Sequence, residues 1–260
     1  IDADIWGAEL EFEWYTEALP GVSIDGAYSF LDTEVAKGSK SVDRTNLTAG
    51  DAAWTTVNEF IPGVTAGVNY VVKTEEYKAA LPALQALVLP GTSFTAASTN
   101  TIIPGSVRDN GLPAYLNRAT AEHKAFGITT SDGISQDLGG NELPNSPAHT
   151  IKLGAAYKWP ITRLDGDLIL RLDYYWQDDM YARELSTPGD EIESWDQWNM
   201  SVIYESADQR WSGKFWARNL ADDDNITGHY LTSDTSGFFS NYFLTEPRIF
   251  GLSVRYSFGY

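Results

Sequence analysis

The segment Phe250-Gly251-Leu252-Ser253-Val254-Arg255-Tyr256-Ser257-Phe258-Gly259-Tyr260 alternates strictly between apolar residues and small or polar ones. A period of two residues is the spacing of a β-strand whose two faces meet different surroundings. Aromatic residues crowd the end of this segment, and transmembrane barrels carry such residues where their strands cross the membrane interface. The pattern predicts a strand of an outer-membrane β-barrel.

Six further segments alternate in the same way, and their apolar sets contain no charged residue. They lie at residues 8–14, 22–31, 150–159, 168–177, 197–204 and 211–218. The opposite sets contain acidic and basic residues. A Lys or Arg at the membrane midplane costs about 2–4 kcal/mol on a lipid-facing strand, so an uncharged face is expected where strands contact lipid. We therefore predict an all-β fold, an antiparallel transmembrane β-barrel of which about seven strands are present.

The composition disfavours several classes of protein. The net charge of −18 makes nucleic acid a poor partner, and the chain has no cysteine for disulfides or thiolate chemistry. No apolar run reaches the roughly 20 residues of a transmembrane helix. The three histidines, His123, His149 and His229, lack metal-ligand spacing, and no nucleophile motif or acid pair stands out. We expect neither an enzyme nor a bound cofactor.

The connections between the predicted strands alternate between short and long. Short ones lie near 19–21, 160–166 and 206–210, and long ones at 33–147, 178–195 and 221–248. Outer-membrane barrels have short periplasmic turns and long extracellular loops. This pattern directs the last strand into the periplasm and puts residue 1 outside the cell. Since complete bacterial barrels have even strand numbers, residues 1–260 are expected to be the C-terminal part of a larger barrel.

The segment 33–147 is the longest of the predicted extracellular loops. Thr74 followed by Glu75 and Glu76 predicts a helix start, with Pro82 expected to break or restart that helix. Pro90-Gly91 is expected to end it, and residues 55–72 contain strand-like stretches that fit an extra hairpin. The loop is therefore expected to contain a short helix or a hairpin.

Three stretches resemble the C-terminal barrel of TonB-dependent outer-membrane receptors. The segment Asn145-Ser146-Pro147-Ala148-His149-Thr150 resembles the strand entry P-x-H of that family. The segment Ala217-Arg218-Asn219-Leu220-Ala221-Asp222 resembles its V-x-N-L-F-D motif, with Ala221 where Phe is common. The segment Glu246-Pro247-Arg248-Ile249-Phe250-Gly251-Leu252 resembles the P-R-x-x-G-L lead into the last strand.

This resemblance implies a 22-stranded barrel in the outer membrane of a Gram-negative bacterium, surrounded by lipid and closed by an N-terminal plug domain. It further implies uptake of a scarce small molecule, such as a siderophore, cobalamin or a carbohydrate, powered by the TonB complex. Neither the plug nor the segment that contacts TonB is recognisable in this sequence.

The polar strand faces and the outer loops supply the candidate site residues. We expect nine charged residues to line a wet lumen: Glu9, Glu11, Glu13, Lys152, Arg171, Asp173, Lys214, Arg218 and Arg255. The candidate ligand contacts on the loops are Trp176, Tyr181, Arg183, Trp195, His229, Tyr230, Phe238, Phe239 and Tyr242. The run Asp222-Asp223-Asp224 is a weak candidate for a divalent cation, with a solvated acidic loop as the other interpretation.

One alternative belongs to a different class. A soluble, acidic, aromatic-rich β-sandwich that binds carbohydrate also has alternating strands, but its apolar face is packed against a second sheet. The two hypotheses differ in whether the apolar face is covered by protein.

Overall fold

In a computed structural model of the 260-residue chain, residues 2–60, 67–86, 100–102, 127–233 and 236–258 are described. The chain divides into two compact units. Unit 1 comprises residues 1–36, 140–230 and 242–260, and unit 2 comprises residues 37–139 and 231–241. No helix in the described ranges is long and apolar enough to cross a membrane.

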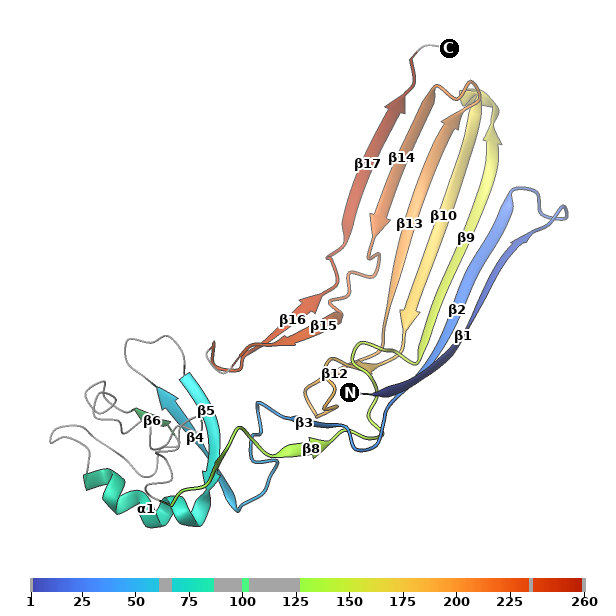
Figure 1. Cartoon of the computed structure of the whole chain (residues 1–260). Helices are drawn as coiled ribbons and strands as arrows, with labels where there is room; N and C mark the ends of the chain where they lie inside the picture. The colour runs from blue at the N-terminus through green and yellow to red at the C-terminus, as the bar shows by residue number, and fades with distance from the viewer. Residues whose placement is uncertain (1, 61–66, 87–99, 103–126, 234–235, 259–260) are drawn as a thin grey trace. The chain divides into compact units, whose positions relative to one another are not determined.

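Unit 1 is built on one antiparallel sheet of seven long strands (Figure 1). In spatial order the strands are β1 (Ala3–Tyr15), β2 (Val22–Val35), β9 (His149–Ile161), β10 (Gly166–Gln177), β13 (Trp195–Ser206), β14 (Trp211–Arg218) and β17 (Ile249–Tyr256). All seven predicted strands are present, and chain order equals spatial order. Among the described strands, β1 and β17 each have one neighbour, so the sheet is open.

The strand connections confirm the predicted alternation of lengths. One end of the sheet carries only tight turns, including a short 3₁₀-helix at Thr162–Leu164, and we call it the short-turn end. The other end, the long-loop end, carries two small two-stranded elements, the first in unit 1 and the second divided between the two units. These are β11 (Met180–Tyr181) with β12 (Glu191–Ile192), and β15 (Ile226–Leu231) with β16 (Ser240–Leu244). Residues 231–241 of the second element belong to unit 2.

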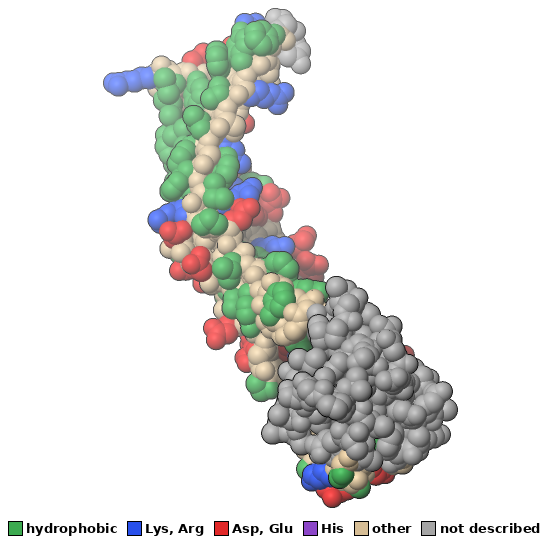
Figure 2. All heavy atoms as spheres, turned by 90° about the vertical axis from the view of Figure 1, so that its left-hand side faces the viewer, with side chains coloured by type: hydrophobic (Ala, Val, Ile, Leu, Met, Phe, Trp, Pro, Cys, Tyr) green, Lys and Arg blue, Asp and Glu red, His purple; other side chains and the backbone are tan. Residues whose placement is uncertain are grey.

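The apolar face of the sheet is exposed. Leu10, Leu153, Phe215 and Leu252 are 63%, 44%, 39% and 74% exposed, although all four lie within strands. The register confirms that the predicted apolar sets share this face, because Leu10 pairs with Tyr28, which in turn pairs with Ile151. Figure 2 shows hydrophobic side chains gathered over the strands, beside groups of acidic and basic side chains.

The last strand is shorter than the alternation predicted. Strand β17 ends at Tyr256, and Phe258 follows it with 86% of its surface exposed. Tyr260 lies outside the described residues. The last backbone hydrogen bond on this side runs from the Ser257 amide to the carbonyl oxygen of Arg210, just before β14 begins. Because β14 has no residues further along to pair with, the alternating pattern in the sequence continues past the end of the hydrogen-bonded strand.

Unit 2 contains a four-stranded sheet and one helix. The sheet has the order β6 (Asn100–Ile102), β4 (Trp54–Phe60), β5 (Gly67–Lys73) and β7 (Thr130–Ser131). A separate pair joins β3 (Lys40–Val42) to β8 (Ser135–Asp137), and α1 spans Thr74–Ala86. Its buried apolar residues are Leu47, Tyr70, Val71, Val72, Ala80, Ile128 and Leu138.

Helix α1 begins at Thr74, but the break expected at Pro82 is wrong because the helix continues to Ala86. Proline removes one backbone hydrogen bond and bends a helix, and it need not end one. Pro82 is exposed, so water can satisfy the carbonyl group that loses its partner. The end expected at Pro90-Gly91 lies outside the described residues.

Candidate functional site

The register brings the nine predicted lumen residues onto one face of the seven-stranded sheet. Glu13 pairs with Asp25, Lys152 with Tyr175, and Asp173 with Asn199, so the polar sets of neighbouring strands align. This face, which we call the polar face, is opposite the uncharged one. A surface with charges on one side of a single sheet and hydrocarbon side chains on the other suits a boundary between water and lipid.

Arg171 on β10 links this strand to β2 across the intervening strand β9. Its Nη1 and Nη2 atoms donate hydrogen bonds of 2.8 and 3.0 Å to the two carboxylate oxygens of Asp25 on β2. Its Nε atom donates a 2.8 Å bond to Asp173, two residues along β10. The guanidinium crosses β9 at Gly154, where a β-carbon would clash with it and lie 2.5 Å from the Asp25 carboxylate. Glycine at this position therefore permits the ion pair.

Acidic residues gather on the polar face at the β1 edge. Glu13 lies directly opposite Asp25, and the Tyr15 hydroxyl donates a hydrogen bond to Glu13. Beside them, Glu11 and Lys152 line a hollow of about 440 Å³. Toward the short-turn end, a second ion pair joins Lys158 to Asp167 at 2.8 Å. The polar face therefore carries ion pairs in its middle and toward the short-turn end.

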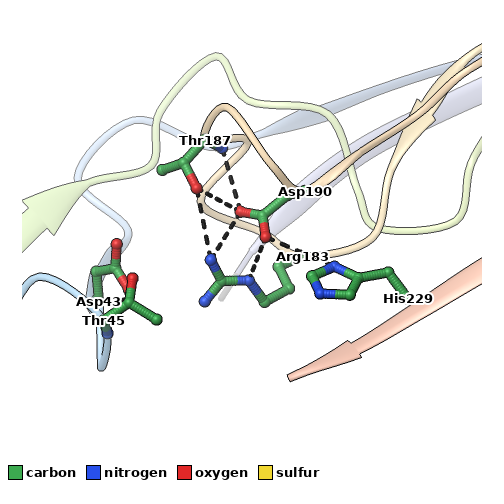
Figure 3. Close-up of polar contacts among 6 residues, drawn as sticks. All are labelled: Asp43, Thr45, Arg183, Thr187, Asp190 and His229. Atoms are coloured by element: carbon green, nitrogen blue, oxygen red, sulfur yellow. Dashed lines mark hydrogen bonds and ion pairs between the residues drawn. The ribbon is translucent and has the colours of Figure 1, made fainter. Parts of the chain in front are cut away.

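At the long-loop end, the β11–β12 loop is organised around the carboxylate of Asp190 (Figure 3). Arg183 donates to its two oxygens at 2.6 and 2.9 Å, and the Thr187 hydroxyl donates at 2.5 Å. The Thr187 amide adds a 3.3 Å bond to the same carboxylate. The side chain of Asp190 is only 2% exposed, so this charge is buried with its partners.

Two opposing effects act on the pKa of the Asp190 carboxyl. Burial raises it, because a desolvated carboxylate is costly. The hydrogen bonds from Arg183 and Thr187, with the positive charge of the guanidinium, lower it by more, so the pKa lies below its usual value. Asp190 is therefore an ionised anchor of the loop. The guanidinium of Arg183, which was predicted as a ligand contact, instead donates hydrogen bonds to this buried carboxylate.

His229 on β15 lies against the same carboxylate. Its Nδ1 atom is 3.8 Å from Asp190 Oδ1, and its side chain is only 3% exposed. Neither ring nitrogen has a hydrogen-bond partner. The ring of Tyr242 on β16 stacks on His229, with centroids 5.1 Å apart and planes at 17°. In this arrangement His229 is covered and Tyr242, which is 50% exposed, is the outer ring.

The remaining predicted ligand contacts fall into separate places. Trp176 pairs with Ile151 on the apolar face, whereas Trp195 pairs with Gln177 on the polar face, so the two indoles project from opposite sides of the sheet. Tyr181 lies in β11, half-buried, and Tyr230 on β15 is 55% exposed. Phe238 and Phe239 belong to unit 2, where Phe239 is 54% exposed.

The acidic run Asp222-Asp223-Asp224 is engaged with a basic side chain. Arg248 donates its backbone amide to Asp222 Oδ1 at 2.9 Å and a guanidinium nitrogen to Asp222 Oδ2 at 3.2 Å. No set of three or more His, Asp or Glu side chains within the described ranges is arranged to hold a metal ion. The cation hypothesis therefore finds no support in the geometry.

Sequence reasoning missed the two residues that organise the loops. Asn219, 2% exposed, is one, and Asp190 is the other. Asn219 adopts a left-handed backbone conformation with φ of 49°, which asparagine tolerates better than most residues. Asn219 lies in the segment that resembles the N-L-F-D motif, and this could have marked it as structurally important. The motif does not show, however, which groups its side chain bonds to.

Solved structures with a similar arrangement include two bacterial receptors. The siderophore receptor PiuA from Acinetobacter baumannii matches 98% of this chain at 14% identity, with a TM-score of 0.50. The fold is a partial outer-membrane β-barrel. The chain spans only 22% of the length of PiuA. The ferric yersiniabactin uptake receptor FyuA from Yersinia pestis matches 99% of this chain, covering 30% of its own length, at 10% identity and a TM-score of 0.43.

No protein-family model and no curated protein sequence matches this chain. At such low identity, the structural likeness establishes the fold and leaves function to be argued from the residues.

Proposed function

We propose that this chain forms part of the wall and outer loops of an outer-membrane receptor that takes up a scarce nutrient with energy from the TonB complex. The observation that carries the proposal is the two-sided sheet. One face is uncharged and exposed within its strands, at Leu10, Leu153 and Leu252 among others, and the other holds an ionised network around Arg171.

The exposed apolar face argues for lipid. In water, each exposed large apolar side chain forgoes the transfer free energy of burial, about 25 cal/mol for each Å². Contiguous apolar patches larger than a few hundred Å² are rare on soluble monomers. In a bilayer the same side chains meet hydrocarbon, and the penalty disappears. The partner of this face is therefore outer-membrane lipid, in a Gram-negative cell.

The same exposure speaks against the soluble sandwich. A sandwich buries the inner face of each sheet against the other, about 10 Å away. The largest sheet of the described residues keeps that face open, and the buried apolar residues outside it belong mostly to unit 2.

The ligand is proposed to be a small molecule that meets the long-loop end. The aromatic residues Tyr230 and Tyr242 are exposed there and offer flat apolar surfaces with hydroxyl groups. The similar solved structure PiuA is a siderophore receptor, which supports a siderophore ahead of cobalamin or a carbohydrate. A plug domain and the TonB complex are the proposed protein partners. The proposal contains no catalytic step.

Two measurements test the proposal. Cell fractionation followed by extraction should release the protein from outer membranes only with detergent, and a protein that stays monodisperse in detergent-free buffer would refute the membrane assignment. Uptake of radiolabelled ferric siderophores, cobalamin and oligosaccharides should then be compared in cells with and without the gene. Loss of uptake of one ligand class, reproduced by a proton-gradient uncoupler, supports TonB dependence.

A further inference from the structure

The β15–β16 hairpin is attached to the barrel sheet through a compact polar root. Asn219 Nδ2 donates hydrogen bonds to the carbonyl oxygens of Asp223 at 3.0 Å and Glu246 at 2.9 Å. Its side-chain oxygen accepts a 3.2 Å bond from the Asp223 amide. Arg248 adds bonds to Asp222 and, at 3.2 Å, to the carbonyl of Leu220. The root thus ties the residues before β15 to those after β16.

The part of the hairpin that leaves this root within unit 1, residues 226–230 and 242–244, is here called the arm. Its apolar side chains are unusually exposed: Ile226, Tyr230, Tyr242, Phe243 and Leu244. The one ring of the arm that is covered is His229, which lies between Tyr242 and the Asp190 carboxylate of the β11–β12 loop. His229 is therefore the seat at which the arm meets that loop within unit 1.

The seat is weak for two independent reasons. First, 3.8 Å between Nδ1 and Oδ1 is too long for a hydrogen bond, and the imidazole makes no other one. A buried polar group without a partner is costly, so the closed position of His229 is disfavoured by its own nitrogens. Second, the Asp190 carboxylate already accepts bonds from Arg183 and Thr187, so it loses little if the imidazole leaves.

We propose that the contact between His229 and the β11–β12 loop is releasable: the arm, anchored at the Asn219–Arg248 root, opens locally at His229 and presents the imidazole to solvent. If the function proposed above is correct, the opened imidazole becomes a recognition group for a ligand that offers hydrogen-bonding oxygen atoms. The opening itself does not depend on that function, because it follows from the geometry of the seat. Buried polar atoms without partners are rare in native structures, and a role outside the closed state explains this one.

Carbethoxylation of histidine by diethyl pyrocarbonate measures the opening directly. The reagent modifies an accessible, unprotonated imidazole nitrogen, and peptide mass spectrometry assigns the product separately to His123, His149 and His229. The experiment uses the whole protein in detergent micelles, with a short histidine peptide as the reference for full accessibility. The rates are measured in buffer and again in urea below the unfolding transition.

We expect His229 to react about tenfold to a hundredfold more slowly than the peptide, and at a rate almost unchanged by urea, because local opening exposes little surface. Protection beyond about a thousandfold, or a rate that climbs steeply with urea, would mean that His229 is reached only through unfolding and would overturn the proposal. A rate equal to that of the peptide would also overturn it, since no closed seat would exist.

A variant at the root provides the matched comparison. Arg248→Lys keeps the positive charge and the backbone bond to Asp222 but loses the guanidinium bonds to Asp222 and to the Leu220 carbonyl, and it should speed carbethoxylation of His229 by about threefold or more. His149 at the start of β9 serves as the internal control, and its rate should not change. The reactivity of His229 reports only on opening of the arm. This experiment can therefore support or overturn the proposed opening independently of the uptake assay.

Discussion

A single arginine placed on either face of the sheet distinguishes lipid from water. Ala155 lies at the middle of β9 on the apolar face, between Ile24 and Leu172. Ala27 lies near the middle of β2 on the polar face, between Glu11 and Lys152. The substitution Ala→Arg is chemically identical at the two positions, so their difference isolates the environment of each face.

The expected magnitudes follow from depth and charge. Arginine at the midplane of a lipid-facing strand costs about 2–4 kcal/mol, so Ala155→Arg should lower the free energy of unfolding by about 3 kcal/mol. That is a factor of more than a hundred in the folding equilibrium, since about 1.4 kcal/mol corresponds to tenfold. Ala27→Arg places a cation opposite Glu11 on a wet face. Exposed ion pairs contribute about 0–1 kcal/mol, so this substitution should change the free energy of unfolding by no more than about that amount.

The assay is equilibrium unfolding by guanidinium chloride in phospholipid vesicles, followed by tryptophan fluorescence, with gel mobility of unheated samples as a second probe. Wild type, Ala155→Arg and Ala27→Arg are compared at one lipid-to-protein ratio. Equal losses in the two variants would refute the assignment of the faces. A larger loss for Ala27→Arg would show that the charged face is the one in contact with hydrocarbon.

Three further changes have defined outcomes. Gly154→Ala should displace Arg171 from Asp25 and lower the free energy of unfolding by about 1 kcal/mol, and the same substitution should cost almost nothing in an Asp25→Ala background, which removes both the ion pair and the crowding carboxylate. His229→Phe keeps a stacking ring but removes the two unbonded nitrogens, so it should raise the free energy of unfolding by roughly 1 kcal/mol while impairing uptake. The pKa of Asp190 is below its usual value in the folded state, so its contribution to stability is full above about pH 4 and declines as pH falls through the folded pKa; thermal melts of wild type and Asp190→Asn should therefore converge in acid.

The strands of unit 1 were predictable because their signal is local. A period of two residues places Leu168, Leu170 and Leu172 on one side of β10, whatever the rest of the chain does, and the register agrees with that placement. The same parity puts Trp176 on the apolar face. Grouping it with Trp195 as a contact for one ligand neglected that parity, and the structure separates the two.

The loop geometry was not predictable because it depends on partners far apart in sequence. Asn219 bonds to Glu246, 27 residues later, and His229 meets Asp190 across 39 positions. The sequence around Arg183 does not show that its guanidinium binds Asp190 rather than a ligand. A pattern of residue types identifies groups capable of binding, and only the fold shows which of them are already bound to each other.

That distinction changes which residues are worth testing in the loops. Arg183 and Asp222 are charged and lie in acidic loops, yet each is committed to an internal pair. His229 is buried, yet its nitrogens are uncommitted. A side chain that has no internal hydrogen-bond partner can bind a ligand without first breaking a bond within the protein. It therefore contributes more net binding free energy than a side chain whose internal partner must be replaced. By this reasoning the covered imidazole is a better candidate for recognition than the more conspicuous charges around it.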